Sequence, residues 1–194
     1  METGSKDIKS LYLQKDSSLD ANRFKQCHSS FLLKKDGIAF IIYDSNKKNI
    51  LAFYEHSWNR NASIDEIINR LEQFFLDFEF NFEDGLSNNW FIDSAKMCLS
   101  PLELYEENMG GEILALSSRV NTDEIVKNEN WAKQHIICSY SLPKTLDDWL
   151  NFNFPHSEKF HHSKAFVQLY NHYPQYGTYV HLHIENNYSD LLIC

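Results

Sequence analysis

One stretch near the N-terminus constrains the fold more than any other: three apolar runs separated by two turn signals. Residues 29–33 and 38–43 flank the pair Asp36-Gly37, which is a strong short-range signal of a β-hairpin. A polar turn sequence at 44–49 leads into the third apolar run, at 50–54. The pattern predicts a three-stranded antiparallel meander.

The next signal is that of an amphipathic helix. Ser63 and Glu66 have the spacing of a capping box, in which each residue satisfies a free backbone donor of the other. The apolar positions that follow recur at helical spacing. They are Ile64, Ile67, Ile68, Leu71, Phe74, Phe75 and Phe78.

The secondary-structure signals between residues 90 and 134 are weaker. Residues 90–99 predict a fourth strand with a break at Asp93-Ser94, and Ser100-Pro101 opens a helix that Gly110-Gly111 interrupts or ends. Residues 117–134 are polar, as expected of a surface excursion.

The C-terminal third predicts two helices and three strands. Residues 136–140 are a fifth strand, and Thr145 with Asp148 caps a short helix. A longer helix is expected over 157–173, before strands at 179–184 and 189–194 that begin a second hairpin. Aromatic residues make up 14% of the chain, so ring packing must dominate the core.

The predicted order is β-β-β-α-β-α-β-α, which indicates an α/β protein with a mixed sheet. We expect a polar lead-in at 1–26, a first unit at 27–175, and the opening hairpin of an incomplete second unit at 176–194. An antiparallel meander followed by α/β crossovers is the ribonuclease H-like unit of actin-like ATPases.

Particular stretches resemble an uncharacterised Bacteroidota family, the domain of unknown function 3822, which has an actin-like ATPase fold. They are 29–44 with 49–53, 96–105, and the segments Ser141-Leu142-Pro143, Phe154-Pro155 and His162-Ser163. The resemblance covers most of residues 27–193 and implies the ribonuclease H-like fold.

The resemblance also implies a place for Mg-ATP, which active members of this fold hold with an Asp and a Gly in each of two hairpin turns. Lys35 stands where the first Asp is expected, and the second turn lacks the Gly. A vestigial phosphate site would use Asp36, Gly37, Glu185 and Asn187. Two ordinary turns explain these residues better, so neither a catalytic residue nor a bound cofactor is expected.

Charge and cysteine usage exclude other classes of protein. A net charge of -9 repels phosphate backbones, so no nucleic-acid partner is expected. The strand 28–33 has no carboxylate for a two-metal nuclease. The four cysteines are dispersed, and no apolar stretch is long enough for membrane insertion, so we expect a cytoplasmic protein with free thiols.

The C-terminal histidines raise the hypothesis of a metal-binding site. His181 and His183 share one face of a predicted strand, and His162 or His172 could supply a third ligand. No metal motif supports this arrangement, so no metal site is expected.

Three functions remain. The leading hypothesis is a non-catalytic actin-like scaffold that binds another protein, and the strand edge between Ser189 and Cys194 is a candidate place for that partner. The alternative is a degenerate ATP-binding protein, and the third is a metal-dependent enzyme that uses the C-terminal histidines.

Overall fold

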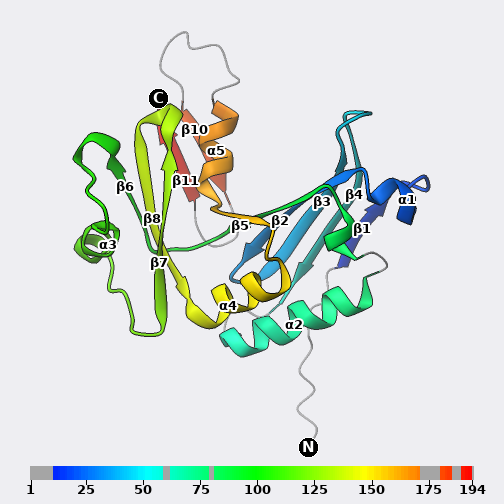
Figure 1. The fold of residues 1–194 in the computed structure, drawn as a ribbon, viewed down its shortest axis with the longest axis horizontal. Coiled ribbons are helices and arrows are strands. Elements are labelled where there is room, and N and C mark those ends of the chain that lie inside the picture. The colour runs from blue at the N-terminus through cyan, green and yellow to red at the C-terminus, as the bar shows by residue number, and fades with distance from the viewer. Residues whose placement is uncertain (1–10, 59–61, 79–80, 171–179, 185–188, 194) are drawn as a thin grey trace, which may run out of the picture.

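The computed structural model describes residues 11–58, 62–78, 81–170, 180–184 and 189–193 (Figure 1). Its strands are β1 (Leu11–Lys15), β2 (Cys27–Lys34), β3 (Gly37–Asp44), β4 (Asn49–Ser57), β5 (Ser87–Ile92), β6 (Met97–Pro101), β7 (Glu124–Trp131), β8 (Ile136–Pro143), β9 (Glu158–His161), β10 (Val180–Ile184) and β11 (Ser189–Ile193). Its helices are α1 (Ala21–Phe24), α2 (Ile64–Asp77), α3 (Gly110–Ser117), α4 (Lys144–Asn153) and α5 (Ser163–Tyr170). Short 3-10 turns occupy Phe82–Asp84, Leu102–Leu104 and Ala132–Gln134.

The main sheet has six strands in the order β1-β4-β3-β2-β5-β9. Strands β2, β3 and β4 form the antiparallel meander predicted from the sequence, and β1 extends it at one edge. Strand β5 is parallel to β2, and β9 is parallel to β5. The meander followed by parallel strands is the ribonuclease H-like order, so the predicted mixed α/β fold is confirmed.

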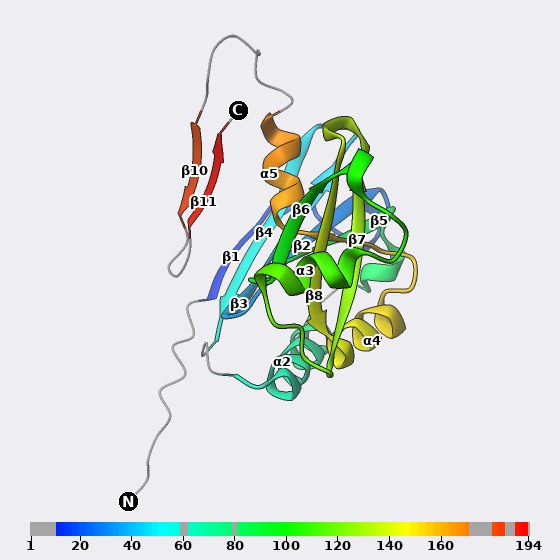
Figure 2. The ribbon, with the colours of Figure 1, turned by 90° about the vertical axis from the view of Figure 1, so that its left-hand side faces the viewer.

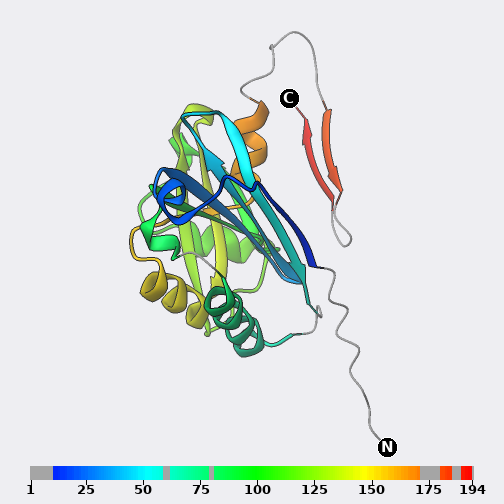
Figure 3. The ribbon, with the colours of Figure 1, turned by 90° about the vertical axis from the view of Figure 1, so that its right-hand side faces the viewer.

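Helix α2 makes the first crossover, from β4 to β5. The predicted capping box is present: Ser63 Oγ accepts from the N–H of Glu66, and the Glu66 carboxylate accepts from the N–H of Ser63. Helices α2 and α4 cover one face of the main sheet, whereas α5 lies on the other (Figures 2 and 3). Strands β10 and β11 form a separate hairpin, and β11 contacts α5.

The second crossover, from β5 to β9, contains an entire second sheet. Strands β6, β8 and β7 pair antiparallel in that order, with α3 packed on them and α4 leading back to the main sheet (Figure 1). The central strand β8 is buried from Ile137 to Leu142, because both of its neighbours and α3 cover it. The inserted sheet is therefore an integral layer of the molecule rather than a surface loop.

The core beneath α2 and α4 consists largely of aromatic rings, as the composition predicted. Phe31 of β2 stacks on Trp90 of β5 with ring centroids 4.5 Å apart, and both side chains are fully buried. Phe75 of α2 and Phe154 approach the same pair edge-on or tilted. Offset and edge-to-face contacts of this kind stabilise beyond the area they bury.

Several expectations for residues 90–134 are wrong. The predicted break at Asp93-Ser94 is present, but the run 90–99 is two strands in different sheets rather than one interrupted strand, because the chain leaves the main sheet there. The expected helix after Pro101 is only a 3-10 turn, since Pro101 still pairs with Ile136 in β6. Gly110 begins α3 instead of ending a helix. The expected surface excursion contains β7, whose Lys127 is paired with Asp147 of α4 at 2.6 Å.

Expectations at both ends of the described chain also need correction. The expected lead-in contains β1 and α1. Strand 136–140 belongs to the inserted sheet, and the fifth strand of the expected unit is β9, inside the predicted helix 157–173. Helix α4 begins after Pro143 without a side-chain cap, so Thr145 and Asp148 do not cap it. The predicted hairpin at the C-terminal end is present as β10 and β11.

Three of the four cysteines, Cys27, Cys98 and Cys138, are free thiols. None of the helices that the structure describes is long and apolar enough to span a membrane.

Candidate functional site

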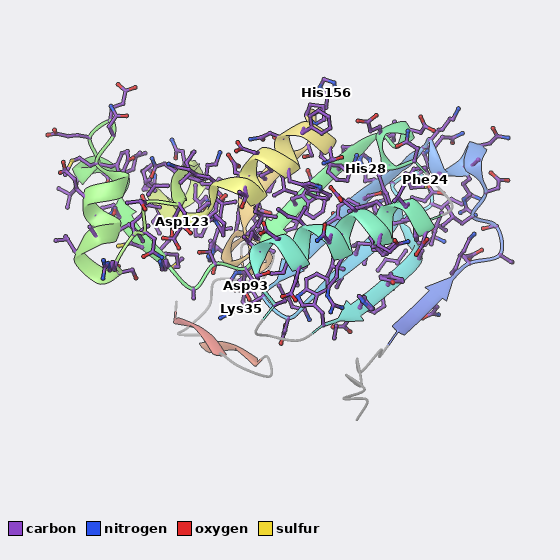
Figure 4. All side chains as sticks on the ribbon, turned by 90° about the horizontal axis from the view of Figure 1, so that it is seen from below. Phe24, His28, Lys35, Asp93, Asp123 and His156 are labelled. Atoms are coloured by element: carbon purple, nitrogen blue, oxygen red, sulfur yellow. The ribbon has the colours of Figure 1, made fainter. Side chains whose placement is uncertain are left out.

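The first candidate site is a hollow of about 330 Å³ at the carboxyl ends of β2 and β5. In open α/β sheets, ligands bind outside the carboxyl ends of the parallel strands. Lys35 and Asp93 line the hollow and lie at this end of the sheet, away from Phe24 and His28 (Figure 4). Glu124 and Ser141 line it from the inserted sheet, and Lys96 lines it from the segment just before β6.

Most charges around this hollow are already paired. Lys34 lies 2.9 Å from Glu55, and Lys96 lies 2.7 Å from Glu124. Although burial opposes the effect, the N–H of Asn121 and the Lys96 ammonium lower the pKa of Glu124. The His162 ring nitrogen Nδ1 lies 3.6 Å from Asp93. The hollow therefore presents compensated pairs rather than a concentrated charge of one sign.

Asp36 in the β2–β3 turn and Gly37 at the start of β3 lie beside the hollow and form the first half of the vestigial phosphate site. Trp58 holds this turn closed: its N–H donates to the Asp36 carbonyl at 2.8 Å, and its indole N–H donates to the Lys35 carbonyl at 3.0 Å. Gly37 pairs with Lys34 in the strand ladder. A Cβ at Gly37 would lie 2.5 Å from the His56 carbonyl oxygen of β4, so strand packing itself requires this glycine.

The second half of that site, Glu185 and Asn187, lies outside the described residues, as do His172 and Cys194. His181 and His183 occupy alternate positions of β10. Among the residues the structure describes, no three His, Cys, Asp or Glu side chains come together to hold a metal ion.

Sequence reasoning did not find a polar junction between the two sheets. Glu129 of β7 accepts from the backbone N–H of His161 in β9, and its other oxygen accepts from the Trp131 indole at 2.9 Å. His161 is fully buried and its Nε2 lies 2.9 Å from the Ser94 carbonyl oxygen. Burial raises the pKa of Glu129, although Trp131, His161 and Lys164 all favour its carboxylate form. No acid-base pattern in the sequence marks this junction, because Glu129 and His161 are 32 positions apart.

The second candidate site is a groove of about 730 Å³ between α2, α4 and the 3-10 turn Phe82–Asp84. We call it the aromatic groove. Its walls are the rings of Phe75, Phe78, Phe82, Trp149, Phe152 and Phe154. The Trp149 indole donates to Glu72 Oε1 at 3.1 Å, which ties α4 to α2 across the groove.

Two large apolar side chains on the walls of this groove are exposed to solvent. Leu76 of α2 is 79% exposed and Phe152 of α4 is 85% exposed. Both lie outside the buried face of their helix. A large apolar residue at such a position is the sequence signal that could have predicted an exposed apolar surface here. Exposed large apolar residues beside a groove are typical of an interaction surface.

The charged side chains that line the aromatic groove are acidic. In the part of the chain that the structure describes, they are Glu72 and Glu83, and no Lys or Arg lines the groove. The C-terminal turns of α2 and α4 both contribute to the groove, and neither last turn has a basic residue. Beyond the end of α4, however, the Lys159 ammonium donates to the Phe154 carbonyl at 3.3 Å, so the acidic character of the groove rests on the two carboxylates rather than on the helix ends.

The strand order, the crossover helices and the hairpin at the carboxyl end together define a protein of the actin-like ATPase fold class. A crystal structure from Bacteroides thetaiotaomicron, of a protein with actin-like ATPase fold and unknown function, matches with a TM-score of 0.80 at 20% sequence identity. That match covers 91% of this chain and 68% of the other. The family model "Protein of unknown function (DUF3822)" matches residues 16–194, and the chain belongs to this family. No curated protein matches the sequence.

Proposed function

We propose that this protein is a non-catalytic interaction module, a pseudo-ATPase that uses the actin-like scaffold to bind another protein. The observation that carries the proposal is the pair of exposed side chains, Leu76 and Phe152, on the walls of a large aromatic groove. The β2–β3 turn supports the non-catalytic part, because Lys35 stands where a metal-holding Asp is expected and packing against β4 already accounts for Gly37. The free thiols Cys27, Cys98 and Cys138 suit the cytoplasm, which we propose as its location.

Calorimetric titration with Mg-ATP tests the non-catalytic part. We expect no binding heat and no change in the melting temperature at millimolar nucleotide. Binding that is lost in Asp36→Asn, with melting unchanged by that substitution, would overturn the proposal.

Such a result would favour the second candidate function, a degenerate ATP-binding protein. The hollow at the carboxyl ends of β2 and β5 favours this candidate, since Lys35 is exposed beside it. A metal-dependent enzyme is the third candidate, and elemental analysis showing stoichiometric zinc in the purified protein would support it.

The strand edge between Ser189 and Cys194 is a separate place for a partner. Strand β11 pairs with β10 in a two-stranded sheet. A partner strand could add to the edge of such a hairpin. Removing residues 189–194 should abolish that binding, whereas substitutions in the aromatic groove should leave it unchanged.

A further inference from the structure

The shape of the aromatic groove restricts what can fill it. Its walls come from α2, α4 and a 3-10 turn, and it has no strand along its length. Helices use their backbone N–H and C=O groups internally, so these walls cannot add a strand by backbone pairing. Side-chain ridges of a third helix can instead lie in the groove between two packed helices.

The lining decides which face of such a helix would point inward. Six aromatic rings and Leu76 offer an apolar floor and wall. The helix must therefore carry large apolar residues at i, i+3, i+4 and i+7. Phe152 and Leu76 are exposed in the free protein, so burying them against those residues would remove apolar surface from water.

The charges of the groove determine which residues should flank the apolar face of the incoming helix. Among the lining residues that the structure describes, the charged ones are the carboxylates Glu72 and Glu83, which stand on the walls. Lys and Arg beside the apolar face of the incoming helix would meet these negative charges, and their aliphatic stems would cover the ring edges. Acidic flanks would be repelled.

We infer that the aromatic groove is the docking site for an amphipathic helix of a partner protein, with large apolar anchors flanked by Lys and Arg. The inference rests on the proposed function and names the partner class for that same surface.

The test uses the full chain and a synthetic, end-blocked peptide of about 16 residues, long enough for several helical turns. The peptide carries Leu and Trp at i, i+3, i+4 and i+7, with Lys and Arg at flanking positions. A scrambled peptide of the same composition and a version with Glu in place of Lys and Arg are the controls. Binding is followed by calorimetry and by the NMR signal of the Trp149 indole N–H, which lies in the groove.

We expect the patterned peptide to bind and to shift the Trp149 indole signal, with the scrambled and acidic peptides at least about tenfold weaker. The double variant Leu76→Ser with Phe152→Ser should lose binding by a factor of about ten or more, because exposed groove anchors are removed. The matched control is Leu104→Ser with Leu116→Ser, which removes two similarly exposed apolar side chains from outside the groove. That control should bind as the native chain does.

Charge is tested separately with Glu72→Gln and Glu83→Gln. Glutamine keeps an oxygen that can accept from the Trp149 indole, so the groove is preserved while its charge is removed. The double variant should bind more weakly, and its affinity should fall less with added salt than that of the native protein.

Equal binding of the patterned and scrambled peptides, or full binding by the Leu76→Ser, Phe152→Ser variant, would overturn the inference. A Trp149 shift with tetramethylammonium but not with the peptide would also overturn it and indicate a cage for a small cation. ATP binding alongside peptide binding would refute the non-catalytic function and leave the docking site standing. Absence of both would refute the docking site alone.

Discussion

Gly37 shows how single residues fix the main sheet. The residue lies at the start of β3, and its Cα faces the carbonyl oxygen of His56 on β4 at a separation that leaves no room for a side chain. Glycine is therefore required at this position because β3 and β4 approach each other closely, and not because of an unusual backbone dihedral.

The first prediction concerns this contact. Gly37→Ala should lower the free energy of unfolding by about 1–3 kcal/mol, because the added Cβ would have to displace β4 backbone. Urea denaturation measures the change. Gly111→Ala is the matched control: a Cβ there meets nothing within 4 Å, so in α3 it should be neutral or stabilise by up to about 1 kcal/mol. Equal stability of Gly37→Ala and the native chain would contradict the packing argument.

The second prediction concerns the turn between β3 and β4. The backbone N–H of Lys47 chiefly lowers the pKa of Asp44, with help from the Arg23 guanidinium and the N–H of Asn46. A carboxylate with a lowered folded-state pKa stabilises the protein above its unfolded pKa, and this contribution is lost as the pH falls through the folded value.

Asp44→Asn should therefore be less stable than the native chain at neutral pH. The difference should shrink as the pH drops below the ordinary aspartate value of 3.8. Denaturation at a series of pH values from neutral to acidic tests this. A difference that stays constant across the series would show that charge is not the cause.

At the scale of elements, α2 has two distinct apolar surfaces. The buried stripe centres on Leu71, which is fully buried, whereas Leu76 belongs to the aromatic groove and is exposed. The same helix thus both covers the sheet and forms one wall of the candidate site.

The third prediction separates these surfaces. Leu71→Ala should destabilise the protein by about 2–5 kcal/mol, because it opens a cavity between α2 and the core. Leu76→Ala should change stability by less than about 0.5 kcal/mol, since that side chain is already in water. Comparable losses for the two variants would mean that the groove is closed in solution.

Local signals in the sequence predicted the elements that rest on local interactions. The hairpin at Asp36-Gly37 and the capping box at Ser63 were predicted correctly, because turn and cap chemistry act within a few residues. Strand β9 was missed because its pairing with β5 is set by contacts distant in the chain. The start of α3 was missed because Gly110 packs against Asn128, another long-range contact.

The candidate site was less predictable than the fold. The sequence correctly placed a tight turn at Asp36 with Gly37 directly after it, but the clamp by Trp58 depends on a contact across more than 20 residues. The aromatic groove lies between α2 and α4, which are far apart in the sequence: Glu72 and Trp149, which bond across it, are 77 positions apart. The sequence signal for this groove is that Leu76 and Phe152 are large apolar residues outside the buried faces of their helices.

At the scale of the whole molecule, Glu129 joins the inserted sheet to the main sheet. Its carboxylate receives the N–H of His161 from β9 and the indole N–H of Trp131 from β7. One side chain thereby satisfies donors from both sheets.

The fourth prediction is that Glu129→Ala lowers the free energy of unfolding by roughly 2–5 kcal/mol, because two buried donors lose their acceptor. Hydrogen exchange should show reduced protection in β7 and β9 together. Glu112→Ala, which alters an exposed carboxylate on α3, should stay within about 0.5 kcal/mol of the native chain. Loss of protection in only one sheet would contradict the role of Glu129 as a junction.

The position of the inserted sheet between β5 and β9 has a consequence for the order of folding. Strand β9 must find β5 across residues 93–157, and the entropic cost of closing such a loop rises with its length. The hairpin of β7 and β8 and helix α4 form from contacts close in sequence, so they can form early and shorten the flexible segment. We expect β9 to dock after this hairpin has formed, so substitutions in the β7–β8 hairpin should slow refolding by nearly their whole effect on equilibrium stability, whereas substitutions in β9 should mainly speed unfolding.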